Sequence, residues 1–280
     1  MQLHFPDEPP IEDSGLADYA APPVIEVTLG YQFEPALSYN SLMAADFWDR
    51  VSDKYPVVEE HSALDPVFET FGANDGAIPN QVHVEFVSRA PQPRFFFRSE
   101  RGSELLQFQR DRLHFNWRGF AAEEPYPRYP AVRSRFEEAL AEHDQWSRGI
   151  EWNPRPTQAE IAYINRVPLI DGNGDPCGLS QLFPWLAGLP GTTETGAFNF
   201  KRRLLDKADR PVARLHFSLQ YGTDDRGDRA AQLMFLVRGL PHEVSRSSCL
   251  DFLDEGRKVI VNTFTSMTSS AAHARWERQA

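Results

Sequence analysis

Two runs of short strand-forming segments, each closed by an amphipathic helix, are the feature that most constrains the fold of this chain of 280 residues. The first run starts with a strand in APPVIEVTLGYQF, where β-branched residues follow a proline pair that cannot join the interior of a ladder. A helix capped by Asn40 or Ser41 follows, and Val57–Asn80 is predicted to be a long connection. Further strands are expected in QVHVEFV, PRFFFRS, ELLQFQ and RLHFNW, and a helix at about 131–146.

The second run repeats this order. TQAEIAYINRVPL is predicted to be a strand, SQLFPWLAG a short broken helix, and GAFNFKRRLL, ARLHFSLQYG and AAQLMFLVRG three more strands. The last helix is expected at about 249–266, opened by Ser248 and Asp251 at capping-box spacing. Each half therefore reads as β-α-β-β-β-α, which predicts an α+β fold with antiparallel sheets and helices packed on one face.

Three pairs of short, similar segments suggest an internal duplication. Ile25-Glu26-Val27 echoes residues 159–161, FFFR at 95–98 echoes FNFK at 198–201, and RLHF occurs at both 112–115 and 214–217. We therefore expect an N-terminal half at 21–150 and a C-terminal half at 151–280, related by a pseudo-twofold axis, with their sheets edge to edge or face to face. A ligand or partner surface is expected between the halves.

Residues 1–20 contain five acidic residues, three prolines and no lysine or arginine, so we expect a disordered acidic leader, with a docking arm for a basic partner as the alternative. The net charge of −11 gives no general attraction to nucleic acid or anionic lipid. No apolar run is long enough for a membrane span, and the two cysteines, Cys177 and Cys249, form no metal or disulfide pattern. A cytoplasmic protein without membrane association is expected.

The common catalytic motifs are missing from the sequence. It contains no Gly-x-x-x-x-Gly-Lys, no Gly-x-Ser-x-Gly and no His-Glu-x-x-His. His83 and Glu85 have the His-x-Glu spacing of zinc deaminases, but Pro176-Cys177 is not followed by the second cysteine that the metal needs. We therefore expect neither a metal nor a cofactor.

Glu26 and Glu160 occupy matching places in the first strands of the two halves. Pseudo-symmetry could bring both carboxylates to one cleft for acid–base or metal chemistry, in which case they should lie roughly 5 to 9.5 Å apart. The favoured alternative is that each pairs with a neighbouring arginine at a sheet edge. Together with His83 and Glu85, they are the candidate catalytic residues.

The segment 112–130 is rich in aromatic and basic residues. Strand alternation predicts that Trp117 belongs to the core and that His114 and Asn116 lie on the opposite face. Tyr126 and Tyr129 either hold the start of the following helix through backbone hydrogen bonds or stack on a ligand. The candidate binding residues are His114, Asn116, Arg118, Tyr126, Arg128 and Tyr129. A nucleic-acid surface would use the arginines at positions 110, 112, 118, 128, 133 and 135.

Six sequence marks in a fixed order resemble a sporadically distributed bacterial family of uncharacterised proteins. The marks are Pro22–Val27 (PPVxEV), Leu105–Gln107 (LLQ), Phe115–Trp117 (FNW), Tyr126–Tyr129 (YPxY), Tyr163–Asn165 (YIN) and Trp276–Arg278. The resemblance covers nearly the whole chain beyond residue 20. It implies a bacterial cytosolic protein carried on mobile or defence-related loci, and it supplies no catalytic residues.

The sequence therefore favours a non-catalytic binding protein that recognises a partner protein or a small ligand through the groove between its halves and through exposed strand edges. Active sites assembled from distant residues leave no local motif, so a hydrolase using glutamates and histidines remains an alternative. A nucleic-acid-binding accessory that uses the arginines of 110–135 is the second alternative.

Overall fold

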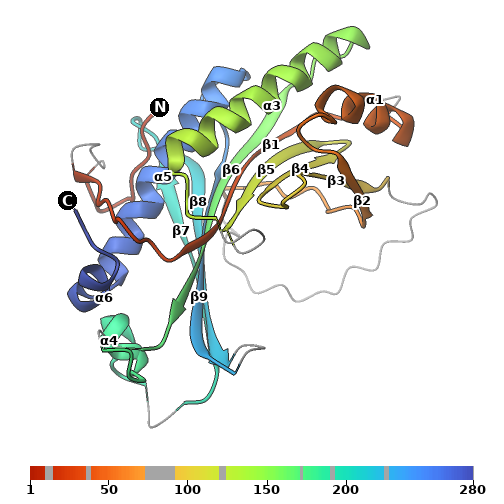
Figure 1. Cartoon of the computed structure of the whole chain (residues 1–280). Coiled ribbons are helices and arrows are strands. Elements are labelled where there is room, and N and C mark those ends of the chain that lie inside the picture. Colours follow the sequence, from red (N-terminus) through yellow and green to blue (C-terminus); the bar gives the residue numbers. More distant parts are fainter. Residues whose placement is uncertain are drawn as a thin grey trace, which may run out of the picture.

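The computed structural model describes residues 1–9, 15–35, 39–72, 92–119, 124–170, 173–189, 193–223 and 227–279. It confirms the α+β class, with one antiparallel sheet of nine strands in the order β2-β3-β4-β5-β1-β6-β9-β8-β7 (Figure 1). The strands are β1 (Val24–Phe33), β2 (Val57–His61), β3 (Arg94–Arg98), β4 (Glu104–Gln109), β5 (Arg112–Arg118), β6 (Pro156–Pro168), β7 (Gly196–Leu205), β8 (Pro211–Thr223) and β9 (Arg229–Gly239). The helices are α1 (Ser41–Val51), α3 (Tyr129–Gly149), α4 (Leu179–Leu182), the 3₁₀ turn η2 (Pro184–Leu186), α5 (Arg246–Met267) and α6 (Ser270–Arg275).

The two predicted halves share this one sheet. The boundary expected at 150/151 falls between α3 and β6, and β1 pairs with β6 along almost its whole length. Of the two arrangements that the sequence allowed, the halves therefore meet edge to edge. The first half also holds a strand that was not predicted, because β2 lies within the expected connection Val57–Asn80 and pairs with β3. The strand predicted in QVHVEFV lies outside the described residues.

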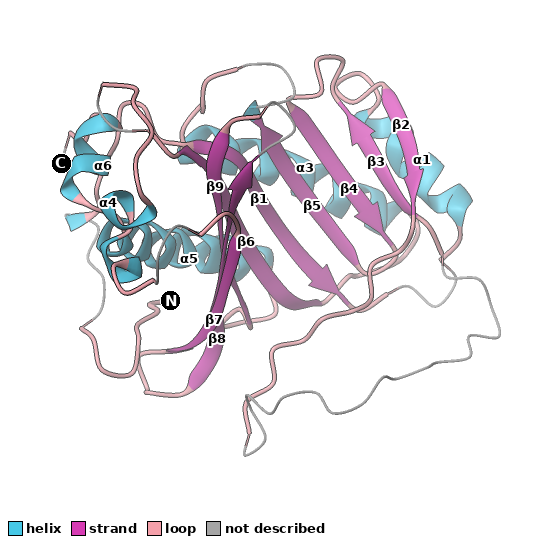
Figure 2. Cartoon of the chain, turned by 90° about the horizontal axis from the view of Figure 1, so that it is seen from below, coloured by secondary structure: helices cyan, strands magenta, loops and turns pink. Residues whose placement is uncertain are grey.

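The long helices lie together on one side of the sheet, as Figures 1 and 2 show. Helix α3 contacts β5 and β1, and α5 contacts β6 and β9. Each helix has an apolar stripe at intervals of three and four residues, as in Val132, Phe136, Leu140 of α3, and buries it against the sheet. Asn40 caps α1 as expected, whereas the N-cap of α5 is Ser245 and not Ser248, so the predicted start of this helix was wrong.

The acidic leader is the region whose structure differs most from its prediction, which was disorder. In its described parts, Leu3, Phe5 and Tyr19 are buried in the core. His4 forms a β-bridge with Leu205 of β7. The leader carries apolar side chains to bury, and two of its described acids have basic partners, Glu8 with Arg202 and Asp18 with Arg128. No helix in the described ranges is long and apolar enough to span a membrane.

Candidate functional site

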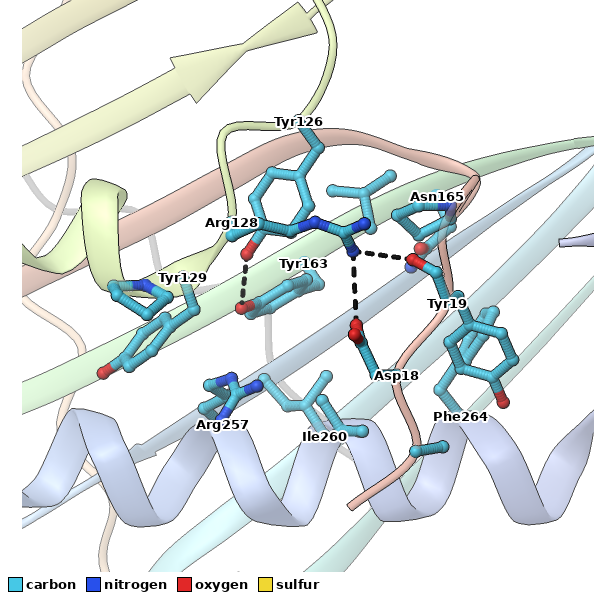
Figure 3. A pocket seen from close by; sticks show the side chains of 15 residues that line it. Asp18, Tyr19, Tyr126, Arg128, Tyr129, Tyr163, Asn165, Arg257, Ile260 and Phe264 are labelled. Atoms are coloured by element: carbon cyan, nitrogen blue, oxygen red, sulfur yellow. Dashed lines mark hydrogen bonds and ion pairs between the residues drawn. The ribbon is translucent and has the colours of Figure 1, made fainter. Parts of the chain in front are cut away.

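A cavity of about 290 Å³ lies where the two halves meet on the helix side of the sheet. Figure 3 shows its walls, which come from four separate segments. The corner before α3 supplies Tyr126, Arg128 and Tyr129, β6 supplies Tyr163 and Asn165, α5 supplies Arg257, Ile260 and Phe264, and the leader supplies Asp18 and Tyr19. This is the region between the halves in which the sequence placed a ligand surface.

Arg128 joins the leader to the corner that precedes α3. Its φ of +76° and ψ of 152° lie in a region that side-chain-bearing residues rarely adopt, and such a conformation costs about 1–3 kcal/mol. One guanidinium nitrogen of Arg128 donates to the Tyr19 carbonyl at 2.6 Å and the other to the Ala20 carbonyl at 3.2 Å. The strained residue thereby holds the leader at the cavity wall.

The phenol groups of the cavity bond to side chains, and not to the backbone as the sequence suggested. The hydroxyls of Tyr126 and Tyr163 lie 3.0 Å apart, and Tyr129 donates to Asp254 at 2.6 Å. Burial raises the pKa of Tyr126, and the neighbouring Tyr163 raises it further. Burial and the Asp254 carboxylate likewise raise the pKa of Tyr129. The cavity therefore presents neutral phenols at physiological pH.

Two guanidinium groups add positive charge to this aromatic lining. Arg257 stands over the ring of Tyr129, 5.0 Å from its centroid, which is a cation–π geometry. Arg128 forms an ion pair with Asp18 at 3.3 Å in which both side chains are largely exposed, so its charge is only weakly engaged. Flat apolar walls with two cations suit a small ligand that combines a ring system with an anionic group.

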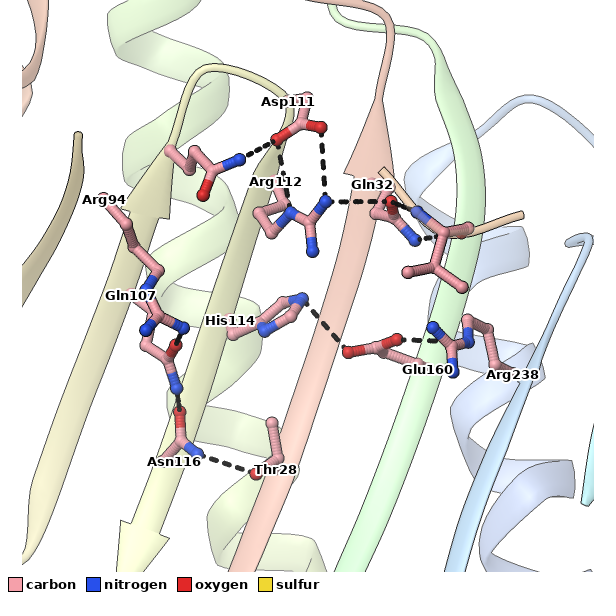
Figure 4. A network of polar contacts seen from close by, with 12 residues as sticks. Thr28, Gln32, Arg94, Gln107, Asp111, Arg112, His114, Asn116, Glu160 and Arg238 are labelled. Carbon is pink, nitrogen blue, oxygen red and sulfur yellow. Dashed lines mark hydrogen bonds and ion pairs between the residues drawn. The ribbon is translucent and has the colours of Figure 1, made fainter. Parts of the chain in front are cut away.

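The face of the sheet opposite the helices, which we call the open face, carries a row of polar side chains, shown in Figure 4. Gly30 of β1 leaves room for the ring of His114 from β5 to lie across it, since a Cβ on Gly30 would stand 2.2 Å from that ring. His114 Nε2 thereby comes within 3.3 Å of Glu160 Oε1, and Glu160 in turn lies 3.6 Å from Arg238. Burial lowers the pKa of His114, and the Glu160 carboxylate opposes this effect.

Asn116 joins three strands on the same face. Its amide nitrogen donates to Glu26 at 2.6 Å and to Thr28 at 2.7 Å, and its oxygen accepts from Gln107 at 2.8 Å. Burial raises the pKa of Glu26, and the bond from Asn116 opposes the rise. Arg118 stands opposite Glu26 in the β1–β5 register and donates to the Gly102 carbonyl.

The structure does not bring together the two candidate catalytic residues that it describes, Glu26 and Glu160. Glu26 pairs with Ile164 and Glu160 with Gly30, so the two glutamates stand four residues apart along the strands, roughly 14 Å. Each instead faces an arginine of the neighbouring strand, Glu26 facing Arg118 and Glu160 facing Arg238, and both lie on strands in the middle of the sheet and not at the edge that the sequence predicted. His83 and Glu85 lie outside the described residues.

The candidate binding residues divide between two places. Tyr126, Arg128 and Tyr129 line the cavity, whereas His114, Asn116 and Arg118 belong to the opposite face. The arginines of 110–135 are dispersed in the same way. Arg112 and Arg118 project from β5 on the open face, while Arg133 and Arg135 stand on α3 and bind Asp254 and Glu104.

Sequence reasoning missed Tyr163, Arg257 and Glu69. Tyr163 lies two residues after Ile161 and therefore on the same strand face, so it could have been assigned to the helix-covered face, but no local signal shows that it meets Tyr126. Within the described ranges, no group of histidine, cysteine, aspartate and glutamate side chains is arranged to hold a metal ion. Comparison with protein-family models gives no match, and comparison with curated proteins gives none either.

Proposed function

We propose that this protein is a non-catalytic binding protein whose cavity between the halves takes a small flat ligand with an anionic group. The observation that carries the proposal is the lining itself, in which three tyrosine rings at 126, 129 and 163 surround a space beside Arg128 and Arg257. Its volume of about 290 Å³ is at the lower end of the range for ligand pockets, so the ligand is the size of one or two fused rings.

The two candidate cations have different roles in this proposal. Arg128 is committed to the leader through two backbone carbonyls, so its first role is to hold the cavity wall. Arg257 comes from α5 and lies against the Tyr129 ring, where a bound carboxylate can reach it. A charge-assisted hydrogen bond of this kind contributes about 1.5–3 kcal/mol, which corresponds to a factor of roughly 10 to 150 in affinity.

The proposal is tested by calorimetric titration with two probes of the same shape, 2-naphthoate and the neutral 2-naphthalenemethanol. We expect the carboxylate to bind at least tenfold more tightly than the alcohol, and Arg257→Gln to remove that difference. Lys207→Gln is the matched control, because it removes an exposed cation in the turn between β7 and β8 and should change neither affinity. Equal affinities for the two probes, or the absence of binding by both, would overturn the proposal.

We also propose that the two halves arose by duplication, and the strand registers support this. Glu26 faces Arg118 as Glu160 faces Arg238, and FFFR in β3 and FNFK in β7 both lie three strands away from the β1–β6 junction. The two RLHF segments do not contribute to this argument. One lies in β5, next to β1, whereas the other lies in β8, two strands from β6.

A further inference from the structure

Residues 62–72, which we call the strap, follow β2 and cross the open face of the sheet. The sheet residues that bind the strap come from six strands in their spatial order. They are Gln109 of β4, Arg112 of β5, Gln32 of β1, Gln158 of β6, Arg238 of β9 and Arg214 of β8. The strap therefore runs across the strands and does not extend the sheet at its edge.

The sheet holds the strap mainly through the backbone of the strap. The amide of Gln109 accepts from the Leu64 N–H and donates to the Leu64 carbonyl, both at 2.8 Å. Gln32 makes the same pair of contacts with Val67, at 3.4 and 2.9 Å. Because these bonds go to peptide groups, any extended peptide could supply them at the same positions.

Apolar burial contributes little to holding the middle of the strap, whereas Phe71 near its end is half-buried with the Arg214 guanidinium 4.6 Å from its ring centroid. Leu64, Val67 and Phe68 are 38%, 42% and 55% exposed, although all three are large apolar residues. A cavity of about 390 Å³ lies beside the strap, lined by Leu64, Phe68 and Gln109 among others. The strap thus rests on polar contacts that a competing chain can reproduce without matching its apolar side chains.

One side chain of the strap, Glu69, enters a basic pocket formed by Arg214, His216 and Arg238, which we call the seat. The Glu69 carboxylate accepts from His216 and from Arg214, both at 2.6 Å, and lies 3.4 Å from the Nε of Arg238. The Glu69 side chain is only 5% exposed. Burial raises its pKa, but the bonds from His216 and Arg214 outweigh this effect and lower the pKa to about 2.

We propose that the open face is a binding track for an extended acidic peptide of a partner protein, and that the strap occupies this track as an internal pseudo-ligand. Gln109 and Gln32 take the peptide backbone of the partner, and the seat formed by Arg214, His216 and Arg238 takes its glutamate. The paired donor and acceptor contacts of the glutamines match peptide groups, whereas a nucleic-acid backbone has no N–H donor to offer them. The track lies on the face opposite the tyrosine-lined cavity, so the two proposals can fail separately.

The test measures binding of a fluorescein-labelled peptide with the sequence of the strap, SALDPVFETFG, by fluorescence anisotropy. In the intact chain the tethered strap competes at a high effective concentration, so the labelled peptide should bind weakly. Glu69→Gln weakens the strap, and we expect this variant to bind the peptide at least tenfold more tightly. A peptide with glutamine in place of its glutamate should bind the same variant at least tenfold more weakly.

Two further variants locate the peptide on the sheet. In the Glu69→Gln background, Arg214→Gln should abolish the gain in affinity, while Lys207→Gln should leave it intact. Hydrogen exchange gives an independent readout, since Glu69→Gln should accelerate exchange at the Leu64 and Val67 amides, whose acceptors are glutamine side chains, without affecting β1 or β6. If Glu69→Gln does not fold, Glu69→Asp, which shortens the reach to the seat, takes its place.

Equal peptide affinity for the intact chain and the strap variant would overturn the proposal, and so would the absence of any measurable peptide binding. An 11-nucleotide single-stranded DNA that bound the Glu69→Gln variant more tightly than the peptide would also overturn it, and would assign the cations of this face to a nucleic acid.

Discussion

The two faces of the sheet are buried by different means. Along β5, Phe115 and Trp117 face the helices and are at most 2% exposed, but His114 and Asn116 on the other face are nearly as inaccessible, at 5% and 3%. The helix side reaches this burial through apolar packing, whereas the open side reaches it through hydrogen bonds and ion pairs. Apolar contacts tolerate many arrangements and polar networks tolerate few, so the helix side supplies stability and the open side supplies specificity.

The largest effect expected from this contrast is a difference in the unfolding free energy lost when two neighbouring residues of β5 are replaced. Phe115→Ala should lower the free energy of unfolding by about 3–5 kcal/mol, because it leaves a cavity in the helix-covered core. Asn116→Ala should cost about 1–3 kcal/mol, because the Glu26 carboxylate and the amide nitrogen of Gln107 both lose the hydrogen bond that they make with Asn116. Urea denaturation of both variants measures the difference, and equal costs would contradict the distinction between the faces.

The pH dependence of stability should also distinguish two individual groups, His143 on the helix side and Glu69 on the open face. His143 lies in the core on the helix side with its Nδ1 2.8 Å from the Tyr31 hydroxyl, and burial lowers its pKa to about 3. Since the unfolded chain binds this proton first, stability should fall by about 1.4 kcal/mol per unit as pH drops from about 6.5 toward 3. Glu69 has a lowered pKa, so its contribution is complete above about pH 4.5 and is lost only as pH falls toward 2.

Denaturation curves at pH 6.5 and pH 5 measure the contribution of His143 before Glu69 titrates. His143→Gln retains a polar partner for Tyr31 and should reduce the loss between these two pH values by about 2 kcal/mol. Burial also lowers the pKa values of His114 and His273, so part of the dependence should persist in this variant. An unchanged pH dependence in His143→Gln would contradict the burial of a neutral imidazole.

The sequence predicted features that depend on local periodicity. The alternation in RLHFNW assigned Trp117 to the core and His114 and Asn116 to the other face, and the spacing of Val132 and Phe136 located α3. These assignments succeed because the side-chain period of a strand or helix is fixed by its backbone geometry.

Features that depend on long-range contacts could not be predicted in this way. The strap shows no hydrophobic periodicity because it binds the sheet mainly through its backbone. Its one buried acidic side chain, Glu69, bonds to Arg214, which is 145 positions away in the sequence. The leader was predicted to be disordered because it combines five acidic residues and three prolines with no lysine or arginine. Its order depends on Leu3 and Phe5 finding a place beside β7, which no local pattern indicates.

Gly30→Ala tests the open face with the smallest change. The new methyl group would stand 2.2 Å from the Cδ2 of His114, so the ring must move and its approach to Glu160 is lost. Overpacking of this kind costs about 1–3 kcal/mol, and the lower entropy of the unfolded chain returns about 0.4–1 kcal/mol, which leaves a net loss of about 1–2 kcal/mol. In the double variant with His114→Ala the methyl group has room, so the penalty of Gly30→Ala measured in that background should disappear. If the penalty persisted, Gly30 would be required by the backbone of β1 and not by the space that the His114 ring needs. The polar side chains of the open face would then not depend on this glycine.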